Sequence, residues 1–269
     1  MNLSTGQDFG ENYIIKQNLL TSPHRGHEVY LVEDKTTKEL LVAKCATSKE
    51  ANQALLSEQK ILQDLSGIPG IPQSVAYHNQ VHFVKYIDTQ FQLGQYVRVD
   101  RPVDEQIKLL PWVERWFKQC VEILKMTHNK NIMHGDMKPQ NIVVDKDNKV
   151  WLVDWDHARR LPETTPQLPV EGTPQYMSPE HVAGKTLDEW ADWYALGMSF
   201  FSICYGSRLT PRYSAGDFKQ RVSKDIVAAI AAGEGVKYNL LPKPRSPLET
   251  DLQSQWRKMT EYDKTKRTV

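Results

Sequence analysis

The sequence has few cysteines, almost no net charge and no apolar run long enough to cross a membrane. Its three cysteines, Cys45, Cys120 and Cys204, are far apart and lack CxxC spacing, which argues against a disulfide framework or a zinc site. The 34 basic and 33 acidic side chains leave a net charge of +1, so there is no general attraction to nucleic acid or to an anionic membrane. The longest apolar stretch, residues 195–204, is about half of what a bilayer requires.

The composition is that of an ordinary globular protein. Apolar residues make up 40% of the chain and charged residues 25%, and a length of 269 residues predicts one large or two modest domains. The first twenty residues include acidic side chains and no long apolar stretch, so we do not interpret them as a signal peptide. We therefore expect a cytoplasmic protein with neither nucleic acid nor a membrane as a partner. The sequence makes no prediction about oligomeric state.

The first third of the chain has the pattern of short strands separated by turns of hairpin length, which favours an antiparallel sheet. One helical segment, with Ser48 as its N-cap, lies between the third and fourth strands. The predicted strands are residues 13–20, 27–34, 40–46, 74–78 and 81–87, and the predicted helix is residues 48–65.

The rest of the chain is mainly helical. Residues 112–129 carry a one-sided apolar stripe, and residues 186–205 are apolar nearly all round, which is typical of a helix buried inside a domain. We therefore predict an α+β fold with two lobes: a small antiparallel β lobe with one helix, residues 1–87, and a larger, mainly α lobe, residues 88–269. A crevice between two lobes is a common place for a ligand.

Lys44 is a charged residue inside an otherwise apolar predicted strand, LLVAKCA. It could simply extend its amine to solvent at the end of the strand. In the following helix, however, Glu58 shares a face with Leu55 and Leu62, so its carboxylate is expected to be buried. Because a buried carboxylate needs a compensating charge, we predict that Lys44 and Glu58 form an ion pair.

A second group of polar residues lies in the segment HGDMKPQN, residues 134–141, which is followed by a predicted hairpin. Pairing Val144 with Val150 across the turn would bring Asn141 beside Val153, and hence next to Asp154. An amide oxygen and a carboxylate suit Mg²⁺ that is held jointly with substrate phosphates. Asp136, on the loop before the hairpin, would be able to act on a hydroxyl.

Each of these residues also has an ordinary structural explanation. Asp136 could cap a turn, Asn141 could satisfy backbone groups, and Asp154 could end a strand. Their occurrence in this order, downstream of Lys44 and Glu58, favours a shared function.

With these motifs the sequence resembles the eukaryotic-type serine/threonine protein kinases, from about Tyr13 to the last residue. VAKC, HGDMKPQN and DWD resemble the lysine strand, the catalytic loop and the metal-binding motif of that family. GTPQYMSPE, residues 172–180, is similar to the end of the activation segment, and DWYALG, residues 192–197, to the start of the central helix. Arg267 stands where the family pairs an arginine with the residue that is Glu180 here.

The resemblance implies a kinase that uses ATP and Mg²⁺ and phosphorylates serine or threonine of a protein substrate. It implies Asp136 as the base, Lys138 on the transferring phosphate, and Asn141 and Asp154 on the metal. Lys138 and Thr173 favour serine or threonine over tyrosine as the acceptor. The implied nucleotide site consists of Lys44, Glu58, Val29 and Ala43 together with the hinge residues Val84, Lys85, Tyr86 and Ile87.

Three motifs depart from the family pattern. Ser22, His24 and His27 replace the glycines of the nucleotide loop, so we expect a looser grip on phosphate and two solvated histidines. Gly135 replaces the arginine that usually receives an activation-loop phosphate, so we expect activity without that phosphorylation. Asp156 replaces the last glycine of the metal-binding motif, which restricts the backbone there.

These departures leave two alternatives to an active protein kinase. A pseudokinase would use the same fold for nucleotide binding or scaffolding, and the altered nucleotide loop is compatible with that function. A small-molecule phosphotransferase would explain the HGD triplet, although GTPQYMSPE favours a segment that binds a peptide.

Overall fold

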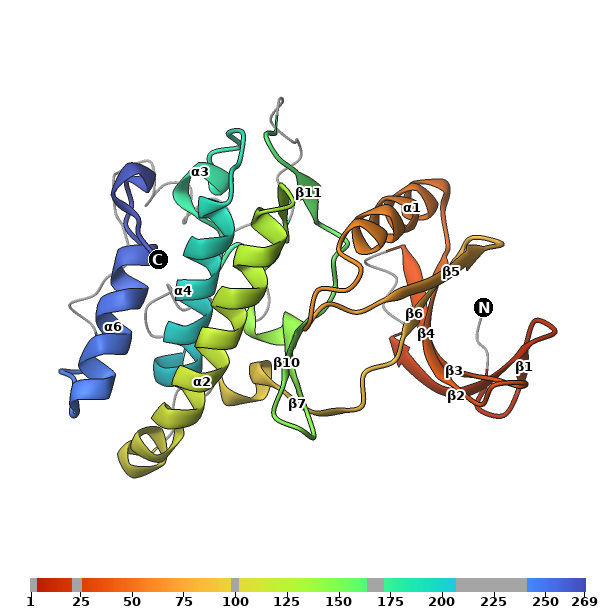
Figure 1. Cartoon of the computed structure of the whole chain (residues 1–269), viewed down its shortest axis with the longest axis horizontal. Helices are drawn as coiled ribbons and strands as arrows, with labels where there is room; N and C mark the ends of the chain where they lie inside the picture. The colour runs from red at the N-terminus through yellow and green to blue at the C-terminus, as the bar shows by residue number, and fades with distance from the viewer. Residues whose placement is uncertain (1–3, 21–25, 98–101, 164–171, 207–240) are drawn as a thin grey trace, which may run out of the picture. The chain divides into compact units, whose positions relative to one another are not determined.

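The computed structural model describes residues 4–20, 26–97, 102–163, 172–206 and 241–269. The chain forms two compact units, Met1–Asp88 and Thr89–Val269. The first unit is dominated by an antiparallel sheet and the second by helices (Figure 1), so the predicted α+β class is confirmed.

The N-terminal unit contains a six-stranded antiparallel sheet with strand order β1-β2-β3-β4-β6-β5. The strands predicted from the apolar pattern are present, but the last one ends at Lys85 rather than at Ile87. A two-residue strand, β1, precedes them and was not predicted. The strands are β1 Asp8–Phe9, β2 Tyr13–Leu20, β3 His27–Asp34, β4 Leu40–Ala46, β5 Ser74–His78 and β6 Val81–Lys85.

Helix α1, Lys49–Asp64, follows β4 as predicted. The Ser48 side chain caps it by accepting a hydrogen bond from the backbone N–H of Ala51 at 3.1 Å. The buried face of α1 includes Leu55 and Leu62 and also carries Glu58, so the helix brings a carboxylate into the interior.

The two faces of the sheet have different roles. On one face a core cluster is formed by Ile15, Tyr30, Val32, Leu41, Ala43 and Phe83. The strand register puts Lys44 opposite Val29 on β3 and opposite His82 on β6, so these three side chains share the other face. Glu58 of α1 contacts Lys44 and His82, so α1 covers this second face.

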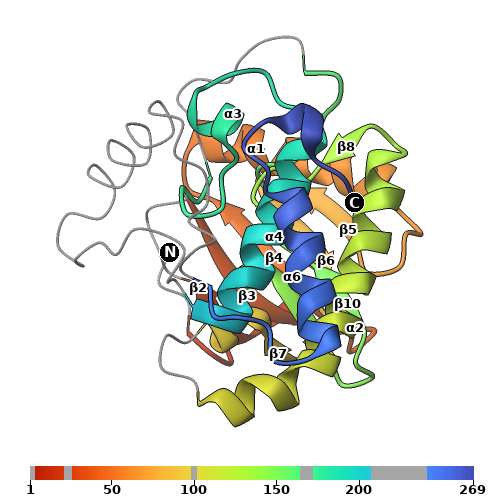
Figure 2. The ribbon, with the colours of Figure 1, turned by 90° about the vertical axis from the view of Figure 1, so that its left-hand side faces the viewer.

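The C-terminal unit is built from helices α2 Val103–His128, α3 Pro179–Val182, α4 Trp190–Tyr205 and α6 Pro247–Met259. Helix α4 lies between α2 and α6 (Figure 1), with α6 in front of it in Figure 2, and its residues from Ala191 to Tyr205 are all buried. The central buried helix expected from the sequence is therefore present, and Gly206 with φ of +66° ends it. Of the helices that the structure describes, none combines the length and the apolar character needed to cross a membrane.

Two helix boundaries were predicted incorrectly. Helix α2 begins at Val103 rather than at residue 112 and continues through Pro111, which cannot donate an N–H to the preceding turn. Buried Leu110 and Val113 flank this proline, so core packing outweighs the lost hydrogen bond. Helix α4 begins at Trp190 rather than at residue 186.

The start of α4 is delayed because the residues before it are held by tertiary contacts. The backbone N–H of Leu187 donates to Glu163 at 2.6 Å, and the Asp188 carboxylate pairs with Lys264 at 2.7 Å. Asp188 also accepts a hydrogen bond from the N–H of Trp190 at 3.1 Å, which marks the first turn of the helix.

Short strands complete the C-terminal unit. Strands β9 Ile142–Asp145 and β10 Val150–Leu152 form the predicted hairpin, with Val144 paired to Val150, and β7 Thr89–Gln92 lies on the other side of β9. Strand β8 Ile132–Met133 pairs with β11 Arg159–Arg160. The polar segments at residues 134–141 and 153–158 are thereby attached to strands at both ends.

Candidate active site

Lys44 and Glu58 form the predicted ion pair in the N-terminal unit. The Lys44 Nζ donates to Glu58 Oε1 at 2.5 Å, with the two side chains 12% and 2% exposed. The other carboxylate oxygen, Oε2, lies 3.1 Å from Nδ1 of His82. Both oxygens of this buried carboxylate therefore have a partner, as a buried charge requires.

The environment of Glu58 keeps it ionised. Burial alone would raise its pKa, but the charge of Lys44 and the hydrogen bond from His82 lower the pKa to about 2, from an ordinary value of 4.5. The carboxylate is therefore available at neutral pH to fix the position of the Lys44 ammonium.

This lowered pKa predicts a pH-dependent contribution to stability. Because the carboxylate is more acidic in the folded than in the unfolded chain, its stabilisation is present above about pH 5 and is lost as the pH falls toward 2. A shift of this size corresponds to about 3 kcal/mol. Glu58→Gln should therefore be less stable than the wild type at about pH 7, and by a margin at least about 1 kcal/mol smaller at about pH 3.5. Urea unfolding at both pH values measures this; an unchanged margin would contradict the account.

The apolar residues expected to contact adenine do not share one face of the sheet. Val29 and Val84 lie on the face of Lys44, but Ala43 is the neighbour of Lys44 in the strand and points to the opposite core cluster, where it is fully buried. The expectation for Ala43 is corrected, because side chains alternate along a strand. Val42, two residues before Lys44 and paired with Val84, occupies the position in question.

The hinge segment continues directly from β6. The backbone N–H of Lys85 donates to the Gln73 carbonyl at 2.9 Å, and that of Tyr86 donates to the Leu40 carbonyl at 3.2 Å. These two groups hold the segment against its own unit. Among the described residues the N–H of Ile87 has no hydrogen-bond partner, which makes it the better candidate to meet a ligand.

The nucleotide loop is described only in part. Ser22 and His24 lie outside the described residues. His27 is not solvated as expected, because it is the first residue of β3, pairs with Ala46 and is buried. Gly26, with φ of +68°, accepts a hydrogen bond at its carbonyl from the N–H of Thr47 at 2.8 Å.

In the C-terminal unit, Asp136 is the centre of a hydrogen-bond network. Lys138 donates to Asp136 Oδ2, and the Thr173 hydroxyl donates to Asp136 Oδ1 at 2.9 Å. The same Lys138 amine lies 3.1 Å from the Thr173 oxygen, so the three side chains form a closed triangle. Asn141 Nδ2 donates to the Asp136 backbone carbonyl at 2.8 Å, which fixes the loop beneath the carboxylate.

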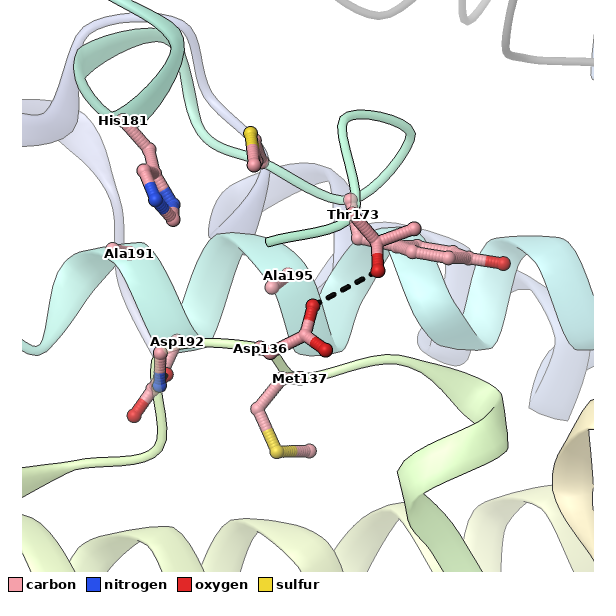
Figure 3. A pocket seen from close by; sticks show the side chains of 10 residues that line it. Asp136, Met137, Thr173, His181, Ala191, Asp192 and Ala195 are labelled. Atoms are coloured by element: carbon pink, nitrogen blue, oxygen red, sulfur yellow. Dashed lines mark hydrogen bonds between the residues drawn. The ribbon is translucent and has the colours of Figure 1, made fainter. Parts of the chain in front are cut away.

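A small cavity adjoins this carboxylate (Figure 3). Its volume is about 10 Å³, and its lining includes Asp136, Met137, Thr173 and Ala195. A space of this size holds about one water molecule. The cavity therefore admits a group of the size of a hydroxyl beside Asp136.

Asp192, at the start of α4, holds the backbone of the loop that carries Asp136. It accepts hydrogen bonds from the N–H groups of His134 at 2.7 Å and Gly135 at 2.9 Å, and lies 2.9 Å from Nε2 of His128. Burial would raise the pKa of Asp192, but the His128 hydrogen bond and nearby histidine charge lower it below its ordinary value. Asp192 is thus an ionised anchor for the loop.

His134 packs its ring against Trp155, with ring centroids 4.6 Å apart. Burial lowers the pKa of His134, so the imidazole is neutral near pH 7. Its Nε2 lies 3.1 Å from the Val153 carbonyl, and with the ring neutral this nitrogen carries the proton and donates. His134 therefore links the loop to the residue that precedes Asp154.

Asp154 follows strand β10 at the predicted place. The N–H of Val153 donates to the Asn141 carbonyl at 2.9 Å, so the hairpin brings the two predicted metal ligands to adjacent positions. Asp154 has φ of +67°, a left-handed conformation that aspartate adopts more readily than most residues. Such backbone strain is frequent at functional sites.

Gly135 also adopts a left-handed conformation, with φ of +79°. A Cβ atom built at this position would lie 2.3 Å from the carbonyl oxygen of His157. The residue that replaces the expected arginine therefore sits where the loop and the segment after Asp154 approach each other too closely for a side chain.

The end of the activation segment is attached to the last residues of the chain. Arg267 donates to both oxygens of the Glu180 carboxylate, at 2.5 and 2.8 Å, and its guanidinium lies 5.0 Å from the Tyr194 ring centroid. The pair predicted from the sequence is thus present, and the Arg267 side chain is fully buried. A buried bidentate pair of this kind fixes geometry.

Few side chains of the site could bind a metal ion. Within the described segments there is no group of three or more His, Cys, Asp or Glu side chains arranged to hold a metal. Asn141 and Asp154 offer one amide and one carboxylate, which are hard oxygen donors. This set fits Mg²⁺ that takes its remaining ligands from water and substrate phosphates, and it does not fit a metal held by protein alone.

Two residues of the site were missed in the sequence. Val42 could have been found from the two-residue period of the strand, because it shares the parity of Lys44. His82 had no such signal, since only the pairing of β4 with β6 brings it opposite Lys44.

Comparison with known proteins supports the resemblance. A family model described as protein kinase domain matches residues 25–269. Serine/threonine-protein kinase AtPK1/AtPK6 of Arabidopsis thaliana is 37% identical over 111 residues, which cover 40% of this chain and 23% of the relative. Serine/threonine-protein kinase ULK3 of Xenopus laevis is 25% identical over 198 residues, 70% of this chain and 41% of the relative.

Serine/threonine-protein kinase 36 of Pongo abelii is 30% identical over 174 residues, 61% of this chain and 13% of the relative. The chain thus spans less than half the length of these three relatives. The family model, in contrast, covers more than half of the chain. The antiparallel sheet of the first unit and the helices of the second agree with the fold of that family. The chain therefore belongs to the protein kinase domain family.

Proposed function

We propose that this chain is a serine/threonine protein kinase that transfers the γ-phosphoryl group of ATP, with Mg²⁺, to a hydroxyl of a protein substrate. One observation carries the proposal: the Asp136 carboxylate is held by Lys138 and Thr173 beside a cavity of hydroxyl size. Phosphoryl transfer depends mainly on positioning and charge stabilisation, so a few fixed polar side chains suffice.

Asp136 is the proposed catalytic base. One of its oxygens orients the acceptor hydroxyl and takes its proton as the bond to phosphorus forms. Lys138, which already donates to Asp136, contacts the transferring phosphate and stabilises its charge. Thr173 completes the triangle and, together with Lys138, favours a serine or threonine acceptor.

Lys44 is the proposed ligand of the ATP phosphates, and Glu58 keeps its ammonium in position. Val29, Val42 and Val84 share the face of Lys44 and supply an apolar surface for adenine, while Ile87 is the proposed backbone partner in the hinge. Ala43 is left out of this set because its side chain belongs to the other face.

Asn141 and Asp154 are the proposed Mg²⁺ ligands. When bound, the ion would neutralise phosphate charge and orient the γ-phosphate. The hairpin register and the hydrogen bond from the N–H of Val153 to the Asn141 carbonyl support this assignment because they put the two residues at adjacent positions.

The proposed lobes are residues 1–87 for nucleotide binding and residues 88–269 for catalysis and substrate binding. We also propose the cytoplasm as the location. All three cysteines lie in described segments and none is in a disulfide, which agrees with a reducing compartment.

Transfer of labelled phosphate from ATP to a generic basic protein tests the proposed function. Wild type should label serine or threonine of the acceptor, and both Lys44→Ala and Asp154→Ala should abolish the label. A wild type that transfers no phosphate and gains no thermal stability from Mg-ATP would overturn the proposal in favour of a scaffolding pseudokinase. Phosphate transfer to small hydroxyl compounds but to no protein would instead indicate a small-molecule phosphotransferase.

The absence of an arginine at Gly135 predicts that activity does not require activation-loop phosphorylation. Thr164 and Thr165 lie outside the described residues, but Glu163 beside them is held by Arg159 at 3.0 Å and by the Leu187 N–H at 2.6 Å. These contacts use no phosphate. The double variant Thr164→Ala, Thr165→Ala should retain at least about half of the wild-type transfer rate. A loss of more than about tenfold would contradict this prediction.

A further inference from the structure

We propose that His82 is a positioning residue of the kinase, which holds Glu58 in the orientation that pairs with Lys44. This inference rests on the proposed function, because its consequence is the placement of the lysine that contacts ATP. His82 acts through Glu58 and makes no proposed contact with substrate.

The contacts of Glu58 support this role. Its side chain is 2% exposed, with Lys44 on Oε1 at 2.5 Å and His82 Nδ1 on Oε2 at 3.1 Å. The His82 side chain is fully buried, so no water competes for this contact. A carboxylate held at both oxygens cannot rotate without breaking a buried hydrogen bond.

The proton on His82 can be assigned from its partners. Ionised Glu58 only accepts hydrogen bonds, so Nδ1 of His82 carries a proton and donates to it. The other ring nitrogen, Nε2, lies 3.0 Å from the Ser74 hydroxyl on β5. Ser74 therefore fixes the second edge of the ring, and the imidazole has one orientation in which both nitrogens have partners.

The strand register explains why this residue can act on Glu58. His82 on β6 lies directly opposite Lys44 on β4, and α1 covers this face of the sheet. The carboxylate thus meets a cation from one strand and an imidazole from its neighbour. Neither strand alone sets the position of Glu58; the β4–β6 pairing does.

The experiment compares His82→Leu, His82→Asn and Ser74→Ala with wild type in two assays. Asparagine retains an N–H donor close to the position of Nδ1, whereas leucine fills the space without a donor. His78→Leu is the matched control, because His78 is an exposed histidine on β5 that stacks on Phe83 at 4.8 Å. Thermal unfolding identifies any variant that has not folded. Ser74→Ala supplies a milder change if His82→Leu does not fold.

The first assay is steady-state phosphate transfer. His82→Leu should lower kcat by about tenfold with little change in the KM of the protein acceptor, because a misplaced lysine affects the reacting phosphate and not acceptor binding. Ser74→Ala should lower kcat less, and His82→Asn should recover most of the wild-type value. Equal kcat in wild type and His82→Leu would overturn the inference.

The second assay does not depend on activity, so it separates this inference from the proposed function. The rate at which a small acylating reagent modifies Lys44, followed by mass spectrometry of its peptide, reports how well the amine is paired. His82→Leu should accelerate this modification several-fold, while His82→Asn and His78→Leu should match wild type. If wild type transfers no phosphate the kinase proposal fails, and unchanged Lys44 modification in His82→Leu overturns the role of His82.

Discussion

Asp136→Asn is expected to lower the rate of phosphate transfer by about 10²–10⁴-fold, the range typical for loss of a general base. Asparagine has nearly the same shape but cannot take the proton of the acceptor hydroxyl. Its amide nitrogen would also compete with the Lys138 ammonium and the Thr173 hydroxyl, both of which donate to the native carboxylate. Initial rates with labelled ATP and a basic protein acceptor measure the effect.

The matched control is Asp147→Asn, in the exposed turn of the β9–β10 hairpin. It makes the same chemical change within the same unit, and transfer by this variant should equal that of wild type. Thermal unfolding checks that Asp136→Asn is still folded at the assay temperature, so that a lost rate reports chemistry. If Asp136→Asn retains more than about a tenth of the wild-type rate, Asp136 is not the base.

Gly135→Ala is the second change with a large expected effect. The added Cβ would lie 2.3 Å from the His157 carbonyl oxygen, in a residue whose φ is +79°. Backbone strain of this kind typically costs about 1–3 kcal/mol, and the clash adds to it. We expect the free energy of unfolding to fall by at least about 2 kcal/mol, and transfer to decline because the neighbouring Asp136 shifts.

Gly67→Ala separates the cost of the backbone conformation from the cost of the steric clash. Gly67 has nearly the same φ, +82°, but beyond its chain neighbours no atom lies within 4 Å of a Cβ built there. This variant carries the conformational cost without the clash, so urea unfolding should show a smaller loss than for Gly135→Ala. Equal losses in the two variants would mean that the His157 carbonyl moves aside and that close approach is not the reason for glycine at position 135.

Much of the N-terminal unit could be predicted because its signals are local. The alternation of apolar residues identified the strands, Ser48 marked the start of α1, and the position of Glu58 on the apolar face of that helix predicted its pair with Lys44. In the C-terminal unit, the hairpin register followed from a single turn and made Asn141 and Asp154 neighbours. Such inferences need only the spacing of apolar residues in one strand or helix, or the length of one turn.

The wrong or missing predictions concern residues whose structure is determined by tertiary contacts. Helix α2 passes through Pro111 because the flanking residues are buried, a fact that local propensity does not contain. His82 joins the site through strand pairing across more than thirty residues of sequence, from Lys44 on β4 to β6. The misassignment of Ala43 differs in kind, since the two-residue period was visible and Val42 was the consistent choice.

The central proposal is that Lys44 and Asp154 both contribute to the binding of Mg-ATP, and calorimetric ATP binding with and without Mg²⁺ tests it most directly. Wild type should bind ATP more tightly when Mg²⁺ is present. Asp154→Ala should lose that increment, while Lys44→Ala should weaken binding by at least about tenfold under both conditions. Wild-type ATP affinity in Lys44→Ala, or an undiminished Mg²⁺ increment in Asp154→Ala, would contradict the account.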